Sequence, residues 1–558
     1  MHKDGSCKIQ IARLGSWGLT RLVGICEEKN MSGIETGMSR RQLLTMIGTA
    51  AGSVVMYNAM TTLGFAQAST YTGPIKLEGD PKGASVLILG AGLAGMTAAL
   101  ELRDAGYKVQ VLEYREKAGG RCWTLRGGDT YVELGGAVQE VKFAEGNYIN
   151  PGPWRIPHHH YGVLDYCKRL GVKLEPFMQV NHNAYLHHTD AFDGKPQRFR
   201  EIAADYRGHV AELLAKVVNQ DALDETVSEE DAALLLESLK TYGVLDENYA
   251  YVKSDDASEH RGWEKEPGGG VDGAPIPSEP IALSEILQSR LWANLITGDS
   301  IDHQGTIFQP VGGMDMIAQG FEKVVGELIT YNAKVTKIEQ SDRGVAVTYV
   351  DSNGGEGEQT ASADYCICTI PFSILGQIEH NFSSEMSSII DSMHYAGSVK
   401  FGLEFKRRFW EQDERIYGGI TYTNLPISQI SYPSTDYFSD GPGVLLGGYS
   451  WGATAYQFNA LPPEERVAKA VEYGAQIHPQ YTQEFSSGVA VTWHRVPWVL
   501  GCYGIWADKE AQYATAAAMD GRTLMAGEHI SYLPAWQEGA ILSALDAVTR
   551  LHQHVVSA

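Results

Sequence analysis

The stretch "ASVLILGAGLAGMTAALELRDAGYKVQVLE", residues 84–113, decides the fold of this chain. It begins with an unbroken apolar run, which is typical of a strand buried on both faces of a parallel sheet. A glycine-rich turn, a helical pattern and a second strand follow directly. This order predicts a Rossmann-like α/β domain.

The turn of this unit has the spacing of a dinucleotide-binding site. Gly90, Gly92 and Gly95 form the pattern G-x-G-x-x-G, and Glu113 closes the second strand. The first two glycines permit a tight turn and the close approach of a pyrophosphate, while the third lets helix and strand touch. The helix N-terminus offers N–H groups to phosphate, and the glutamate can accept hydrogen bonds from ribose. We therefore predict dinucleotide binding.

Strand and helix patterns alternate along the rest of the chain without a repeat of fixed period. We expect helices at 158–171, 200–220 and 228–243, a long loop or lid at 252–281, a hairpin-like strand pair within 307–350, strands at 364–370, 398–405, 417–432 and 444–450, and a last strand and helix within 522–556. The fold class expected from this alternation is α/β or mixed α+β.

The N-terminal segment 1–68 is predicted to be a leader. It contains the twin-arginine pattern "SRRQLL" at 39–44, then a mildly apolar run that ends in the small-x-small sequence Ala66-Gln67-Ala68. The run is rich in Gly, Ala, Ser and Thr, so it is weak as a membrane span, and we expect no stable membrane anchor. The alternative is a poorly packed amphipathic helix. A leader of this kind predicts export to the periplasm or the medium.

Charge and cysteine usage exclude some function classes. The formal net charge is −23, which argues against nucleic acid or anionic lipid as the main partner. Five of the seven cysteines follow residue 68, and their odd number and scattered spacing do not indicate a disulfide framework. The pair Cys366 and Cys368 lies in an apolar strand pattern, where buried thiols are favoured over a metal site.

Several ordered segments of the chain resemble the flavin amine oxidase family. The first is "EYREKAGGRCWT" at 113–124, which is similar to the family's E-x(5–6)-GGR-x-x-T/S segment. The others are "VELGGA" (132–137), "FQPVGGMDMI" (308–317), "NAKVTKIEQ" (332–340), "TIPFSIL" (369–375), "GSVKFGLEFKRRFW" (397–410) and "LMAGEHISYLPAWQEGAILSAL" (524–545). The resemblance implies FAD as cofactor. It also implies a discontinuous FAD-binding domain (84–150, 306–375, 520–558). The segment 151–305 would be a helical and substrate-domain segment, and 376–510 a substrate-binding domain, so that the substrate domain is a mixed sheet plus helices.

The resemblance also implies which residues hold the cofactor. Arg121 would support the phosphate region of FAD, and the backbone of Val335 would meet the adenine. The other implied contacts are Gly90, Gly92, Leu93, Ala94, Gly95, Glu113, Gly152, Trp154, Glu528, Gln537, Glu538, Gly539 and Ala540. Cys502 aligns with a cysteine that some monoamine oxidases join covalently to the flavin, but members that oxidise amino acids generally bind FAD non-covalently.

The segment "GPWRIP" at 152–157 is similar to the one whose arginine binds the substrate carboxylate in L-amino acid oxidases. A guanidinium offers two parallel N–H donors to one carboxylate, so Arg155 is predicted to bind that group. The alternative is an arginine in a structural salt bridge. By the same resemblance, Tyr432 would add a hydroxyl to the carboxylate site, although a tyrosine in a sheet is often a core residue.

Three further residues are expected beside the flavin ring. Lys400, in an apolar strand pattern, matches the family lysine that holds a water near flavin N5, while the alternative is an outward-pointing solvated lysine. Trp536 and Tyr503 match two aromatic residues that would flank the substrate amine. The implied reaction converts an L-amino acid and O2 to a 2-oxo acid, ammonia and hydrogen peroxide. The rival functions are a simple-amine oxidase, an amino acid 2-monooxygenase and a non-catalytic FAD-binding protein. A homodimer is the family expectation.

Three consecutive histidines, 158–160, follow Arg155. If they lie on the helix expected there, neighbouring side chains point to different faces and cannot converge on one ion. We therefore expect no functional metal site in this run.

Overall fold

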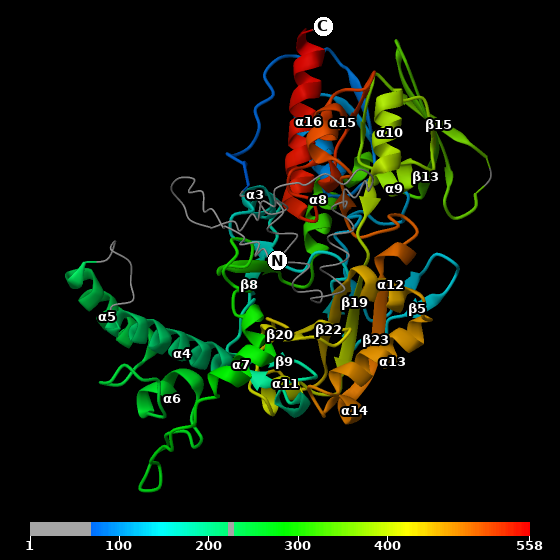
Figure 1. The fold of residues 1–558 in the computed structure, drawn as a ribbon. Coiled ribbons are helices and arrows are strands. Elements are labelled where there is room, and N and C mark those ends of the chain that lie inside the picture. Colours follow the sequence, from blue (N-terminus) through cyan, green and yellow to red (C-terminus); the bar gives the residue numbers. More distant parts are fainter. Residues whose placement is uncertain (1–68, 221–227, 356, 558) are drawn as a thin grey trace, which may run out of the picture. The chain divides into compact units, whose positions relative to one another are not determined.

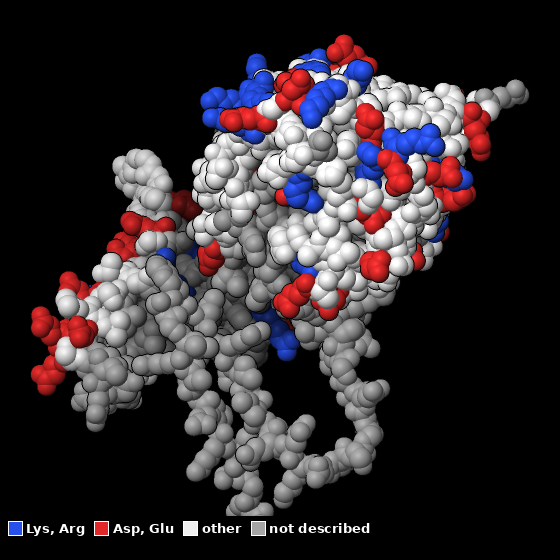
Figure 2. Space-filling model, turned by 90° about the horizontal axis from the view of Figure 1, so that it is seen from above, with Lys and Arg blue, Asp and Glu red and all other residues white. Residues whose placement is uncertain are grey.

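A computed structural model describes residues 69–220, 228–355 and 357–557. The expected leader, 1–68, lies outside the described residues. The described helices include none long and apolar enough to cross a membrane. On the face that Figure 2 shows, acidic and basic side chains are interspersed among wide uncharged areas.

A five-stranded parallel sheet forms the centre of the predicted dinucleotide-binding unit. Its order is β12-β2-β1-β16-β25, and its strands are β1 (Ser85–Leu89), β2 (Lys108–Leu112), β12 (Ile329–Thr330), β16 (Tyr365–Cys368) and β25 (Thr523–Met525). All its strand pairs are parallel. The strands of the central pair, β1 and β16, are buried almost throughout, as their apolar sequences predict. The predicted fold class is confirmed.

Helix α2 (Leu93–Asp104) follows β1 after the glycine turn, and ten of its residues are buried. It packs against α8 (Met316–Val325) and against the C-terminal helix α16 (Gln537–Ser557), drawn in red in Figure 1. These helices share one hydrophobic core with the parallel sheet. The two ends of the described chain therefore meet in one domain.

The hairpin expected within 307–350 is present in a second sheet, of order β15-β14-β13-β17. Strands β13 (Ala333–Ser341) and β14 (Gly344–Asp351) are antiparallel, and β15 (Gln359–Ala363) and β17 (Glu379–His380) flank them. Their alternation of buried and partly exposed residues follows the period of two read from the sequence.

A seven-stranded mixed sheet contains the strands expected at 398–405, 417–432 and 444–450. Its order is β10-β9-β20-β21-β22-β19-β23, and its strands are β9 (Tyr185–His187), β10 (Gln197–Arg198), β19 (Ser398–Phe405), β20 (Ile420–Thr423), β21 (Gln429–Ser431), β22 (Gly443–Trp451) and β23 (Phe485–Thr492). The segment expected as a strand at 417–432 is two antiparallel strands, β20 and β21. Strand β19 lies between β22 and β23 and is buried along its whole length.

The helices expected at 200–220 and 228–243 are α4 (Phe199–Asn219) and α5 (Glu229–Gly243), and α6 (Asp255–Arg261) packs on α4 (Figure 1). The segment expected as a loop at 252–281 thus contains a short helix. Ser254 starts it by accepting a hydrogen bond from the backbone of Ala257.

A small sheet joins two segments that are far apart in sequence. Its order is β7-β11-β8, formed by Ile156–Pro157, Ile307–Pro310 and Leu174–Phe177. Antiparallel pairing of Ile307 with Pro157 brings the segment before β11 beside the segment after β7. The expected helix at 158–171 begins only at Tyr161 (α3, Tyr161–Arg169), because Pro157 and His160 form a turn ahead of it. The histidines therefore precede the helix, contrary to our expectation.

Candidate active site

A cavity of about 690 Å³ lies where the parallel sheet meets the seven-stranded sheet. Its wall includes Gly90, Glu113 and Thr369, which follow β1, β2 and β16, and also Tyr449 and Trp451 of β22. The carboxyl ends of parallel strands, at the point where the strand order reverses, are the usual place for a nucleotide ligand. The volume is within the range of cofactor sites, about 300–1,000 Å³.

Most of the residues predicted to hold the cofactor line this cavity. They are Gly90, Gly92, Leu93, Ala94, Glu113, Arg121, Gly152, Trp154, Val335, Glu528, Gln537 and Ala540. They come from at least six separate segments of sequence, which the fold brings to one wall.

Three predicted contacts do not line the cavity. Gly95 is in close helix–strand packing, since an added Cβ would lie 1.9 Å from the carbonyl oxygen of Gly90. Glu538 accepts hydrogen bonds from the backbone N–H groups of Gly162 (2.9 Å) and Val163 (2.8 Å), so its carboxylate caps helix α3. At Gly539 a Cβ would lie 2.1 Å from the carbonyl oxygen of Leu533. The structure thus gives all three a role in packing or helix capping, and their contact with a cofactor stays a prediction.

The glycine turn fits the phosphate-binding role predicted from its spacing. A Cβ built on Gly92 would meet no atom of the described chain within 4 Å, so this backbone is open to a ligand. Gly90 has a φ of 99°, in the region that favours glycine. Glu113 accepts from the backbone of Ala91 (2.7 Å) and of Arg115 (3.0 Å), and burial raises its pKa. The carboxylate therefore holds the turn in place.

Arg121 and Glu528 form a partly buried ion pair on the cavity wall, and Arg121 also donates to the carbonyl oxygen of Cys502 at 2.9 Å. Glu528 in turn accepts from the backbone of Ala535 at 3.0 Å. Ala535 has a φ of 70°, a strained conformation for a residue with a side chain. The pair joins the GGR segment to the loop before α16, so it shapes the end of the cavity where Trp536 lies.

Arg155 lies on the wall and is 6% exposed. Its guanidinium donates to the amide oxygen of Gln179 at 3.1 Å and contacts Nε2 of His303 at 2.8 Å. Burial, with a further contribution from the Arg155 cation, lowers the pKa of His303 well below its usual value. Gln179 and His303 therefore hold the guanidinium in its orientation on the cavity wall.

Tyr432 does not face the cavity, and this prediction is wrong. Its hydroxyl is buried and contacts His478 at 2.6 Å and Thr421 at 2.8 Å, on the opposite face of the sheet. Because side chains alternate along a strand, the residue next to Thr421, Tyr422, points the other way. The Tyr422 hydroxyl accepts from Gln179 at 3.2 Å, and Gln179 contacts Arg155. Tyr422 is therefore the tyrosine connected to the arginine.

Lys400 lies behind the wall, 2% exposed, and the outward-pointing alternative is excluded. Its ammonium donates to the carbonyl oxygens of Gly152 and Asn150, the latter at 3.3 Å. It lies 4.9 Å from the ring centre of Trp154 and 4.4 Å from that of Tyr449. Burial lowers the pKa of Lys400 well below its usual value.

Aromatic side chains form much of the remaining wall. The predicted residues Tyr503 and Trp536 are there, as are Tyr449 and Trp451, which the sequence analysis missed. Tyr449 and Trp451 have ring centres 3.8 Å apart. Their spacing of two in "GGYSWG" was the available signal, because residues i and i+2 of a strand share a face. Cys502 also lines the cavity, and burial raises the pKa of its thiol.

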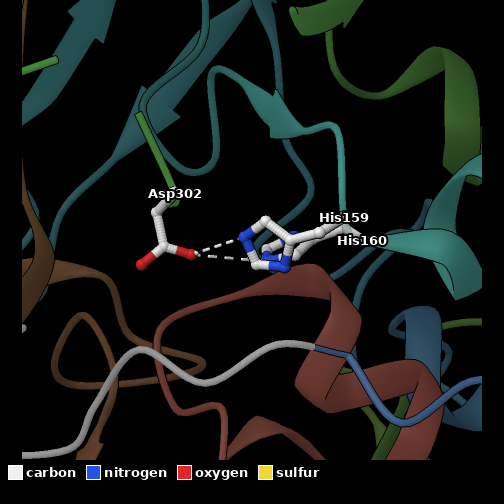
Figure 3. Close-up of side chains that lie close together, drawn as sticks. All are labelled: His159, His160 and Asp302. Atoms are coloured by element: carbon white, nitrogen blue, oxygen red, sulfur yellow. Dashed lines mark hydrogen bonds and ion pairs between the residues drawn. The ribbon is translucent and has the colours of Figure 1, made fainter. Parts of the chain in front are cut away.

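The histidine run lies against Asp302, a further residue of the cavity wall. Nε2 of His159 is 3.0 Å and Nε2 of His160 is 3.8 Å from the same carboxylate oxygen (Figure 3). Two histidines therefore do converge, because they lie in a turn and not on a helix. The His160 ring also meets the edge of Trp536, with ring centres 4.9 Å apart.

This fold is that of the flavin-containing amine oxidoreductases. The chain belongs to the family of flavin-containing amine oxidoreductases, whose sequence profile matches residues 93–552. The family implies a flavin, and the open glycine turn and cavity described above fit one.

Characterised relatives share about a quarter of their residues with this chain. An L-amino-acid oxidase of Siganus canaliculatus is 28% identical over 483 residues, with 84% of this chain and 86% of that protein covered. The flavin-dependent L-tryptophan oxidase RebO of Lentzea aerocolonigenes is 28% identical over 486 residues, with 83% and 97% covered. Among solved structures, a putrescine oxidase bound to putrescine shares the fold, with a TM-score of 0.56, 16% identity, and 85% and 99% covered.

Proposed function

We propose that the protein is an FAD-dependent L-amino acid oxidase, which forms a 2-oxo acid, ammonia and hydrogen peroxide. The observation that supports this best is the position of Arg155. A buried guanidinium lies on the cavity wall, and Gln179 and His303 orient it. A guanidinium offers parallel N–H donors, so it matches a carboxylate in shape and charge. A simple amine offers no such group.

The bound flavin supplies the two-electron oxidation of the substrate, and the protein positions the reacting groups. Arg155 binds the carboxylate and so fixes one end of the amino acid. Tyr503 and Trp536, on the same wall, confine the amino group and exclude water. Lys400, with its lowered pKa, holds a larger share of uncharged amine than a solvated lysine, and an uncharged amine can accept a proton.

The test compares an amino acid with the amine that lacks only its carboxylate, such as phenylalanine and phenethylamine. In the Arg155→Met variant we expect kcat/KM to fall about 100-fold to 1,000-fold for the amino acid, because two charge-assisted hydrogen bonds are lost. For the amine, which never used those bonds, we expect little change. Peroxide release measures both rates, and a panel of the twenty amino acids then identifies the preferred side chain.

Arg198→Met is the matched control. Arg198 lies in the seven-stranded sheet, where it pairs with Glu414 at 3.0 Å, and it is not part of the cavity wall. Its replacement should leave the ratio of the two rates unchanged. A wild-type enzyme that prefers the amine, or an Arg155→Met variant with an unchanged ratio, would refute the proposal and favour a simple-amine oxidase.

The products of the wild-type reaction separate the remaining rivals. An oxidase releases one peroxide for each ammonia, whereas a 2-monooxygenase forms an amide and no peroxide. A non-catalytic protein would leave the flavin yellow when amino acids are added without oxygen. Export through the twin-arginine route stays a prediction, which N-terminal sequencing of the secreted protein would check. A homodimer also stays a prediction, which the mass of the protein in solution would check.

A further inference from the structure

The cluster of His159, His160 and Asp302 has a geometry that the proposed oxidation does not require. All three side chains are buried, and one ligand atom from each lies within 4.8 Å of the others. Figure 3 shows both rings directed at one oxygen of the carboxylate. The distances from that oxygen are 3.0 Å to Nε2 of His159 and 3.8 Å to Nε2 of His160.

The fold fixes the two sides of this cluster independently. The histidines follow β7 in a turn closed by the hydrogen bond from the backbone of His160 to Pro157, at 3.1 Å. Asp302 precedes β11, which is paired with β7. The pairing of β7 with β11 thus brings together residues that are more than 140 positions apart in the sequence.

A hydrogen bond between His159 and Asp302 does not account for His160. Nε2 of His160 is buried and has no hydrogen-bond partner among the described residues, and its side chain is 1% exposed. An unpartnered buried nitrogen is costly, and natural proteins usually give it a protein group, an ordered water or an ion as partner. This nitrogen is directed at the carboxylate oxygen that His159 already contacts. An ion bound between the two nitrogens and this oxygen would give each of them a partner.

The distances between the ligand atoms of this cluster are close to those of a zinc site. Zinc binds histidine nitrogen and carboxylate oxygen at about 2.0–2.2 Å, which places tetrahedral ligands roughly 3.3–3.6 Å from one another. The two oxygen–nitrogen separations, 3.0 and 3.8 Å, lie on either side of that range, and all three ligand atoms lie within 4.8 Å of one another. Side-chain shifts of no more than roughly 1 Å would therefore complete the site. Two nitrogens and one oxygen favour zinc and its neighbours over magnesium or calcium, which prefer oxygen.

We propose that His159, His160 and Asp302 bind a divalent ion of the zinc class at the wall of the cavity. Three protein ligands leave a fourth position, as in zinc sites open to a small ligand. The ion would also join the turn after β7 to the segment before β11. His303, the neighbour of Asp302, contacts Arg155 at 2.8 Å, so the metal would help to fix the guanidinium.

The test titrates zinc chloride into the chelator-treated, flavin-loaded enzyme in a calorimeter. We expect one saturable site in the wild type and at least a 100-fold weaker site in His160→Gln, because one of three ligands is lost. His160 makes no side-chain hydrogen bond to the described residues, so this variant should fold, and its flavin content verifies that. Asp302→Asn, which keeps the shape but removes the charge, is the second variant and should weaken binding similarly.

His187→Gln is the matched control, because His187 is also buried but contacts Thr423 and the backbone of Gly194. It should bind zinc as the wild type does. X-ray absorption at the zinc edge should then show nitrogen and oxygen neighbours and no sulfur. The proposal is overturned if the wild type has no site tighter than about 100 µM, if both cluster variants bind zinc like the wild type, if sulfur ligates the ion, or if magnesium competes equally.

Discussion

Replacement of Gly95 by alanine tests the close packing on which the cofactor turn depends. The added Cβ would lie 1.9 Å from the carbonyl oxygen of Gly90, whereas an ordinary carbon–oxygen contact is about 3.3 Å or more. Helix α2 would have to withdraw from β1 by roughly 1.4 Å. Ten of its residues are buried, so the helix has no space to withdraw into. We expect a loss of about 3 kcal/mol in unfolding free energy, the upper part of the usual range for overpacking.

Gly92→Ala is the matched control for this experiment. Its φ of −73° suits alanine, and the new methyl group would point into open space, so the apoprotein should lose no more than about 1 kcal/mol. The same methyl group would obstruct the cofactor, so the flavin content should fall.

Chemical denaturation of the apoproteins and the ratio of flavin to protein measure both effects. The reasoning fails if Gly95→Ala is as stable as the wild type, or if Gly92→Ala retains a full complement of flavin.

Three further outcomes are expected. Burial lowers the pKa of His478 to about 4. When the pH falls, this histidine therefore binds a proton in the unfolded chain before it does so in the folded one. The unfolding free energy should fall by about 2 kcal/mol between pH 7 and pH 5 because of this group. His478→Asn should flatten that dependence, and an unchanged slope in denaturation curves would contradict us. Arg466 and Glu133 form a fully buried ion pair, so Arg466→Met should cost about 3–5 kcal/mol, and adding Glu133→Gln should recover part of it. A loss in unfolding free energy of less than about 1 kcal/mol for Arg466→Met would contradict this, because water would then solvate the unpaired carboxylate of Glu133. Lys400→Met should lower kcat by about 100-fold to 10,000-fold with flavin retained, and normal turnover would exclude a role in proton transfer.

Local sequence patterns were sufficient to predict strands in which the burial of the side chains is either continuous or strictly alternating. The apolar runs of β1 and β16 predicted buried parallel strands, and the alternation in β13 and β14 predicted a hairpin. The glycine motif located the turn because its requirements are local: Gly90 has a positive φ, and Gly95 packs against the carbonyl oxygen of Gly90.

Local patterns did not predict which face of a strand points toward the cavity. Tyr422 and Tyr432 both lie in sheet segments, and only the register of β20 against β21 shows which tyrosine faces Gln179. The start of α3 was placed too early, because helix periodicity continues through the histidines while a turn at Pro157 delays the helix. A shift of a few residues changed which side chains converge.

The sequence alone determined the class of this protein. Glycine spacing, an acidic strand end and several family-like segments specify a flavin-binding chain, since each depends on neighbouring residues. Tertiary structure alone decided what surrounds the substrate end of the cavity. Gln179 and His303 meet Arg155, and Asp302 meets two histidines, through strand pairing between distant segments. Such contacts depend on register and on the direction of side chains, which no local pattern in one sequence encodes.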